Sequence, residues 1–410
     1  MDVLQIDFGP TARWELPADE RIASCAGPEP IEDDLSAAIE RALLEPIEFP
    51  SLDQAVVPGD KLVLAVDAAL PALAEVVSHV VHWFCQRGCD PANLHVVLSA
   101  GGTQVAPELA AAICQRLGAS VSVEVHDPDD PEKRAYVAAN EASDPIYLNR
   151  SMVDADVIIS LSAARHGSAL DYFGAFSLFP LFSDRLTRGR FYSLPRLDDH
   201  AAHDALRAWA DQAAWWVGLV AGIQLVPAQG NGVHAVLAGQ LEPLEAASQR
   251  AMAQTWDTPS ETSELVVASL DGGDSQQTWL HLARALHTAS HSATSRGSIV
   301  LCTDLSESPG RGLNRLRATH RSVDALAKKL AADDADDAIA AAVLLQTTAH
   351  YHVYLVSNLR EETVESLGMG VVHDQAELAR LIDQHAGCRL LRSAQHCGAR
   401  FQTSVPLHNA

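Results

Sequence analysis

Short apolar runs alternate along the chain with stretches in which apolar residues recur every three or four positions. In the first half this pattern predicts buried strands at 61–67, 93–100 and 157–161, separated by helices at 73–87 and 107–117. Strands that alternate with helices in this way indicate a parallel sheet with right-handed crossover connections. Residues 222–239 predict a different unit, two strands joined by a Gly-Asn-Gly turn, which is a hairpin pattern.

A polar stretch at 257–264 separates these elements from a second series of strands and helices that begins at Leu265. A chain of 410 residues is long enough for two domains, each with its own core. We therefore predict an α/β protein with mainly parallel sheets, divided into a first domain at 1–256, a linker at 257–264 and a second domain at 265–410.

Polar residues follow the predicted strands of the first domain. Ligands of parallel α/β sheets bind beyond the carboxyl ends of the strands, so Asp67, the loop Gly101–Gln104 and His166 mark a candidate site. Each also has a structural interpretation. Asp67 is a favoured helix N-cap residue, and His166 could cap backbone groups. Gly101, Gly102 and Thr103 could cradle an anion through backbone amides or form only a tight turn.

Composition excludes several functional classes. A formal charge of −24 argues against a nucleic-acid partner, because such proteins concentrate Lys and Arg on one face. The apolar runs are too short to cross a bilayer, and acidic Asp2 and Asp7 stand where an export signal would be basic. Seven thinly spread cysteines fit buried thiols in a reducing compartment. We expect a cytoplasmic protein with no membrane partner.

No metal site is predicted from the histidines. Three pairs have spacings compatible with chelation on a helix, His79/His82, His200/His203 and His287/His291. With 18 histidines in the chain such spacings are expected by chance, so we expect none of these pairs to hold a metal ion.

Several segments resemble the nickel-pincer-nucleotide lactate racemases. Residues 42–71, ALLEPIEFPSLDQAVVPGDKLVLAVDAALP, are similar to the opening helix, the first strand and the Asp-x-Thr-Arg-Pro signature of that family. Residues 94–104, LHVVLSAGGTQ, resemble the strand and Gly-Thr-His loop, and residues 149–180 resemble the segment with a histidine, here His166, before a Gly-rich loop and a lysine. The helix SQQTWLHLARALHTA and residues 295–310 are similar to the second domain of the family. The resemblance implies a lactate racemase-like fold with an interdomain cleft.

The groups that the chemistry of this family would require are largely replaced. The resemblance implies a cofactor-anchoring lysine ten residues after His166, but Phe176 stands there and cannot form an amide or thioamide link. Gln104 replaces one of the two histidines that would exchange the hydroxyl proton, and an amide does not titrate at neutral pH. Leu70 replaces the arginine of the signature, which leaves Arg284 as the nearest basic group on the later helix, where a lysine is usual.

The nickel-ligand histidine of the family is also missing at equal spacing. Tyr192 falls at that position, and His200 or His203 could replace it only through an insertion. We therefore expect no covalently bound nickel-pincer nucleotide, although a noncovalent one stays open.

Two hypotheses follow from the residues and the resemblance. The first is a divergent homologue that binds or acts on a small hydroxy acid in the cleft, with His166 as the acid/base group, Asp67 and Gln104 beside it, and the Gly101–Thr103 loop around a cofactor. The second is a non-catalytic protein of the same fold that binds a small ligand or a protein partner. In that case the aromatic loop 172–182 would pack or form a partner surface, and a homodimer is possible.

Overall fold

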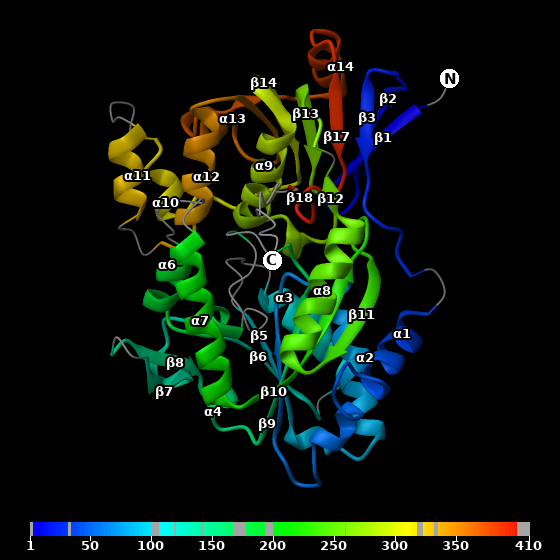
Figure 1. Ribbon diagram of the computed structural model, residues 1–410, viewed down its shortest axis with the longest axis vertical. Helices are drawn as coiled ribbons and strands as arrows, with labels where there is room; N and C mark the ends of the chain where they lie inside the picture. Colours follow the sequence, from blue (N-terminus) through cyan, green and yellow to red (C-terminus); the bar gives the residue numbers. More distant parts are fainter. Residues whose placement is uncertain are drawn as a thin grey trace, which may run out of the picture.

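The computed structural model describes residues 3–31, 34–99, 106–118, 120–140, 143–166, 170, 178–192, 200–258, 260–317, 323–331 and 335–399. Within these residues two six-stranded sheets organise the chain, one in the lower and one in the upper part of Figure 1. Helices pack against both sheets, which gives an α/β fold, as the sequence predicts.

The first sheet has the strand order β11-β10-β9-β4-β5-β6. Its strands are β4 (Leu62–Val66), β5 (Leu94–Leu98), β6 (Ser122–Val125), β9 (Val157–Ala163), β10 (Leu219–Pro227) and β11 (Val233–Gly239). All neighbours are parallel except β10 and β11, which form the predicted antiparallel hairpin. Every residue of the central strands β4 and β9 is buried, which explains their continuous apolar sequences.

The second sheet is entirely parallel, with the order β16-β15-β14-β13-β17-β3. Its strands are β13 (Ser263–Ser269), β14 (Ala293–Cys302), β15 (His352–Val356), β16 (Gly370–Val371), β17 (Cys388–Leu391) and β3 (Ile22–Cys25). The edge strand β3 therefore comes from the beginning of the chain. A hairpin of β1 (Val3–Phe8) and β2 (Ala12–Pro17) packs Ile6 and Phe8 into the same core.

The strands β1, β2 and β3 thus belong with the second sheet, whereas the sequence analysis grouped the first 25 residues with the first half. The apolar residues of β1, β2 and β3 find their partners in β13 and β17, far along the chain. The division into domains at 256 and 265 stays a prediction.

The helices are α1 (Leu35–Leu44), α2 (Leu73–Gln86), α3 (Ala106–Leu117), α4 (Arg150–Val153), α5 (Leu178–Leu181), α6 (Arg185–Tyr192), α7 (His200–Val217), α8 (Leu241–Thr255), α9 (Trp279–Ser292), α10 (Arg311–Asn314), α11 (Val323–Ala331), α12 (Ala338–Thr348), α13 (Glu361–Ser366) and α14 (Gln375–Asp383). A small separate hairpin joins β7 (Arg134–Ala139) to β8 (Pro145–Asn149). Helix α9 packs on β13, β14 and α12. Because α9 is the α-helix that follows β13 in the chain, its first turn lies towards the carboxyl end of that strand. None of the described helices is long and apolar enough to cross a membrane.

Several contacts join the two halves around the carboxyl edge of the first sheet. The predicted linker begins with β12 (Asp257–Thr258), which pairs with β18 (Gly398–Ala399) near the end of the chain. The buried carboxylate of Asp271, which follows β13, accepts hydrogen bonds from the backbone N–H of Gly230 in the hairpin turn, at 2.9 Å, and from Ser393, at 2.7 Å. The carboxyl edge where β4 and β9 end is therefore covered by the second half.

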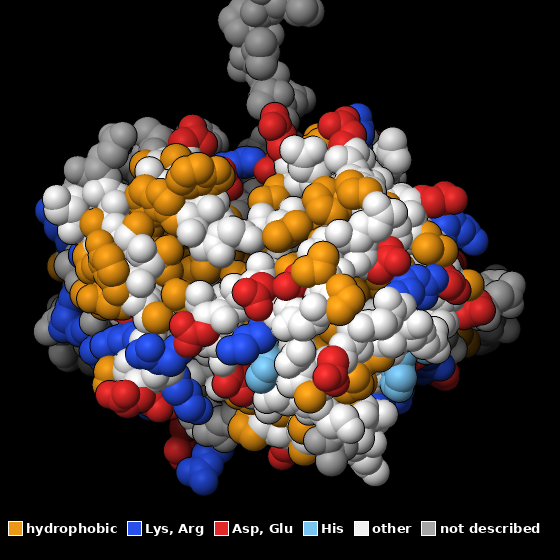
Figure 2. Space-filling view, turned by 90° about the horizontal axis from the view of Figure 1, so that it is seen from below, with side chains coloured by type: hydrophobic (Ala, Val, Ile, Leu, Met, Phe, Trp, Pro, Cys, Tyr) orange, Lys and Arg blue, Asp and Glu red, His pale blue; other side chains and the backbone are white. Residues whose placement is uncertain are grey.

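The described part of the aromatic loop belongs to the core rather than to a partner surface. Phe179 packs edge-on against Phe191 and Trp209, and Phe182 is also buried. Tyr172, Phe173 and Phe176 lie outside the described residues. On the face shown in Figure 2, hydrophobic side chains lie in several patches among acidic and basic ones, so this face presents no single continuous apolar surface.

Candidate functional site

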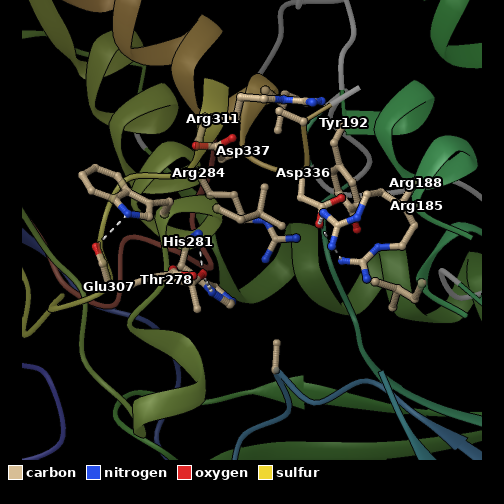
Figure 3. Close-up of a pocket in the computed structure, with 18 of the residues that line it drawn as sticks. Arg185, Arg188, Tyr192, Thr278, His281, Arg284, Glu307, Arg311, Asp336 and Asp337 are labelled. Atoms are coloured by element: carbon tan, nitrogen blue, oxygen red, sulfur yellow. Dashed lines mark hydrogen bonds and ion pairs between the residues drawn. The ribbon is translucent and has the colours of Figure 1, made fainter. Parts of the chain in front are cut away.

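A cavity of about 510 Å³ lies between the two halves, at the carboxyl edge of the first sheet (Figure 3). This volume falls in the range of pockets that bind small organic molecules, roughly 300–1,000 Å³. Five arginines line the described part of the cavity, and they come from both halves: Arg165, Arg185, Arg188, Arg284 and Arg311. The acidic side chains of the lining are Asp67, Glu307, Asp336 and Asp337. The arrangement favours an anionic ligand.

Asp67 and Arg165 form a buried ion pair at the ends of β4 and β9. The second carboxylate oxygen of Asp67 accepts a hydrogen bond from the backbone N–H of Ala69, at 3.0 Å. Helix α2 has Ala72 at its N-cap and no side-chain cap, so the interpretation of Asp67 as a helix cap is wrong. Both oxygens of Asp67 are engaged, and the carboxylate holds Arg165 at the cavity wall.

His166 borders a second, much smaller cavity of about 10 Å³. Its Nδ1 atom lies 3.8 Å from Oδ1 of Asp257, and its ring packs so closely on Gly398 that a Cβ atom there would lie 2.3 Å from it. A space of this size holds about one water molecule at most. His281 and Arg284 line both cavities, so His166 lies directly behind the arginine-lined cavity without lining it.

His281 and His396 are buried beside Arg284, and both are neutral at pH 7. Burial, followed by the positive charge of Arg284, holds the pKa of His281 well below its ordinary value. Burial and the charges of Arg284 and Arg165 lower the pKa of His396 to about 3. Two imidazoles in this state donate or accept hydrogen bonds but do not take up a proton near neutral pH.

The hydroxyl of Thr278 contacts two atoms of His281. The Thr278 hydroxyl is the N-cap of α9 and accepts from the backbone N–H of His281, at 3.3 Å. The same hydroxyl lies 2.9 Å from Nδ1 of His281, and the tautomer of the ring decides which of the two atoms donates. In either tautomer the neutral imidazole has one N–H donor and one acceptor nitrogen.

Two acidic groups of the cavity lining, Glu307 and Asp337, have distinct roles. Burial, helped by the negative charge of Asp337, raises the pKa of Glu307 to about 7, against a hydrogen bond from the backbone N–H of Trp279 that lowers it. The carboxylate of Asp337 accepts from the backbone N–H groups of Gly312, at 2.8 Å, and Leu313, at 3.1 Å, at the start of α10. Asp337 therefore shapes this wall, whereas Glu307 is a buried carboxyl that titrates near neutral pH.

Some of the residues that the sequence analysis singled out lie at the two cavities, and others do not. Asp67 and Arg284 line the cavity, and His166 lies behind it. Gln104, Gly101, Gly102, Thr103 and Phe176 lie outside the described residues. Leu70 is buried in the core of the first half.

The sequence analysis did not single out Arg165, His281 or His396, which line the two cavities. A signal existed for two of them. Arg165 directly precedes His166, and His281 stands three residues before Arg284, on the same face of a predicted helix. Among the described residues no group of three His, Cys, Asp or Glu side chains could hold a metal ion; the side chains of His200 and His203 are not among those described.

Comparison with known proteins shows which fold and which domain this chain resembles. Residues 11–174 match the family model of the lactate racemase N-terminal domain. The fold is similar to that of the lactate racemase apoprotein from Thermoanaerobacterium thermosaccharolyticum, with a TM-score of 0.76 and 15% identity over 98% of this chain and 100% of that chain. A crystal structure of a protein from Thermotoga maritima is also similar, with a TM-score of 0.66 and 14% identity over 92% of this chain and 99% of that one. A comparison with curated proteins gives no significant match.

At these identities the structural likeness establishes the fold alone. Together with the domain match, it defines a lactate racemase-like α/β fold.

Proposed function

We propose that this protein binds a small hydroxy acid in the arginine-lined cavity between its halves and holds it without a covalently tethered nickel nucleotide. The observation that carries the proposal is the convergence of five arginines from both halves on one cavity of about 510 Å³. A guanidinium presents a fork of N–H donors that matches a carboxylate, and such charge-assisted hydrogen bonds are among the strongest in proteins.

Arg284 and His281 supply complementary groups for such a ligand. Arg284 extends from α9 into the cavity in Figure 3 and would bind the carboxylate. His281 lies one turn earlier on the same helix. In the tautomer that carries its proton on Nε2, it would donate a hydrogen bond to the hydroxyl oxygen of the acid. The low pKa of His281 keeps it in this neutral form across the physiological range.

The residues do not fit the tethered nickel group that the resemblance implies. The anchoring position holds Phe176, whose phenyl ring forms no such bond. The position of the nickel-ligand histidine holds Tyr192, a buried phenol whose pKa is raised by burial, whereas nickel is bound in proteins mainly by thiolate and imidazole groups. We therefore derive no chemical step through that group.

The described titratable groups support binding better than racemisation. A two-base exchange of the hydroxyl proton needs groups that titrate near the operating pH on both faces of the ligand. His281 and His396 stay neutral, and Asp67 is held by Arg165, so among these groups and Glu307 only Glu307, with a pKa of about 7, titrates near the operating pH. Phe179 and Phe182 are buried, which gives the alternative of a partner surface on the aromatic loop less support.

Calorimetry with lactate and glycerate tests the binding site. We expect both acids to bind, and Arg284→Gln to weaken binding by about tenfold or more, because a charge-assisted hydrogen bond is lost. Arg380→Gln is the matched control, since Arg380 is exposed on α14, far from the cavity lining. If neither acid binds, or if both variants lose binding equally, the proposed site is wrong.

Intact mass and metal analysis test the cofactor statement. We expect the purified protein to have the mass of its polypeptide alone. A nucleotide adduct with stoichiometric nickel would overturn this part of the proposal. Incubation of one lactate enantiomer with the protein tests catalysis: racemisation that His166→Ala abolishes would establish an isomerase instead of a binding protein.

A further inference from the structure

Arg188 on α6 is a buried cation with unused hydrogen-bonding capacity. Its side chain is 3% exposed and lines the arginine-lined cavity. In the described part of the chain its guanidinium, with five N–H donors, makes no hydrogen bond, and its Nε atom is fully buried. Its described ion-pair contact is with Asp336, at 3.9 Å, which is too long for a hydrogen bond.

The neighbouring acidic groups are already engaged elsewhere. Asp184, one helical turn before Arg188, accepts hydrogen bonds from the backbone N–H of Thr187, at 3.1 Å, and from its hydroxyl, at 2.8 Å. Asp336 also contacts Arg185, at 3.4 Å, so one carboxylate is shared between two guanidinium groups. The fully buried Nε atom has lost its hydration without gaining a hydrogen bond, which costs stability.

A group that is buried at a cost to stability and directed into a cavity points to a ligand. In Figure 3 Arg188 reaches the cavity from α6 of the first half, beside Asp336, whereas Arg284 reaches it from α9 of the second half. The cavity volume of about 510 Å³ is also larger than a three-carbon acid bound at Arg284 would fill.

We infer that Arg188 binds a second anionic group of the ligand, so that the natural ligand is an acid with two anionic groups, one held by Arg284 and one by Arg188. This inference rests on the proposed function, since it assigns the ligand class of the same cavity. The second group is a carboxylate or a phosphate, and both present the oxygen acceptors that a guanidinium recognises.

Three related acids separate these cases by calorimetry. Glycerate has one anionic group, malate adds a second carboxylate, and 3-phosphoglycerate adds a phosphate to the same hydroxy acid. We expect the wild type to bind malate or 3-phosphoglycerate about tenfold or more tightly than glycerate, and the tighter of the two identifies the second group. Arg188→Met should remove this preference. Arg190→Met, on the same helix but outside the cavity lining, should retain it.

The thermal stability of the unliganded variant supplies a second readout. If Arg188 serves a ligand, Arg188→Met removes an unsatisfied buried charge and raises the melting temperature. If Arg188 is a structural ion-pair partner, the same change lowers the melting temperature, and the inference is wrong.

Each other outcome has a defined meaning. Equal weakening of glycerate and of the two-anion acids by Arg188→Met would show that Arg188 and Arg284 bind the same carboxylate, which overturns the inference. Glycerate binding with no preference for a second anion overturns the inference and leaves the proposed function standing. Failure of all three acids to bind the wild type refutes both.

Discussion

The buried carboxyl of Glu307 makes the stability of this protein depend on pH in a direction that can be calculated. Its folded-state pKa is about 7, above the ordinary value of 4.5, with burial as the first cause and the charge of Asp337 added to it. A group whose pKa rises on folding is more easily ionised in the unfolded chain. The associated stability is fully present below pH 4.5 and is lost as the pH rises to about 7.

The magnitude follows from the shift. At 1.36 kcal/mol per pKa unit, ionised Glu307 lowers the free energy of unfolding by at most about 3 kcal/mol above pH 7. Glu307→Gln removes this loss, because the amide stays neutral and keeps an oxygen that accepts the backbone N–H of Trp279. The variant should therefore be more stable than the wild type at pH 8, with an advantage that shrinks towards pH 5.

Urea unfolding at pH 5 and pH 8 measures this effect. The difference in unfolding free energy between Glu307→Gln and the wild type should grow by about 2 kcal/mol from the lower to the higher pH. Glu20→Gln, at an exposed position in the turn before β3, should show the same difference from wild type at both pH values. If the difference in unfolding free energy between Glu307→Gln and the wild type is the same at both pH values, the reasoning is refuted.

Three further changes test the packing around the cavities. Asp67→Asn leaves the charge of Arg165 buried without its counter-ion and should cost about 3 kcal/mol of unfolding free energy in urea; a cost below about 1 kcal/mol would contradict a buried pair. Thr278→Ala removes the N-cap of α9 and should cost about 1 kcal/mol by thermal unfolding, whereas Thr278→Ser should restore most of it. Gly398→Ala places a Cβ atom 2.3 Å from the ring of His166 and should destabilise by about 1–3 kcal/mol, with a shift of the His166 imidazole NMR signals; unchanged signals would contradict this contact.

Local patterns in the sequence predicted most of the first sheet. The apolar runs of β4, β5 and β9 and the Gly-Asn-Gly turn of the β10–β11 hairpin are recognisable because their signals lie within a few residues. The place of β3 could not be predicted in this way. Its partner β17 begins at Cys388, and a short edge strand carries no local mark of the distant strand that it joins.

The same distinction between local and tertiary information applies to the candidate site. Chain order alone placed Asp67 and His166 at the carboxyl ends of parallel strands, and the resemblance drew attention to Arg284. Only the tertiary structure decides that Arg188 and Arg284 line one cavity and that His281 is neutral. Periodicity and turn residues are local properties of a sequence, whereas burial and the distance between charges depend on how the two halves pack, and these set the charge and chemistry of the cavity.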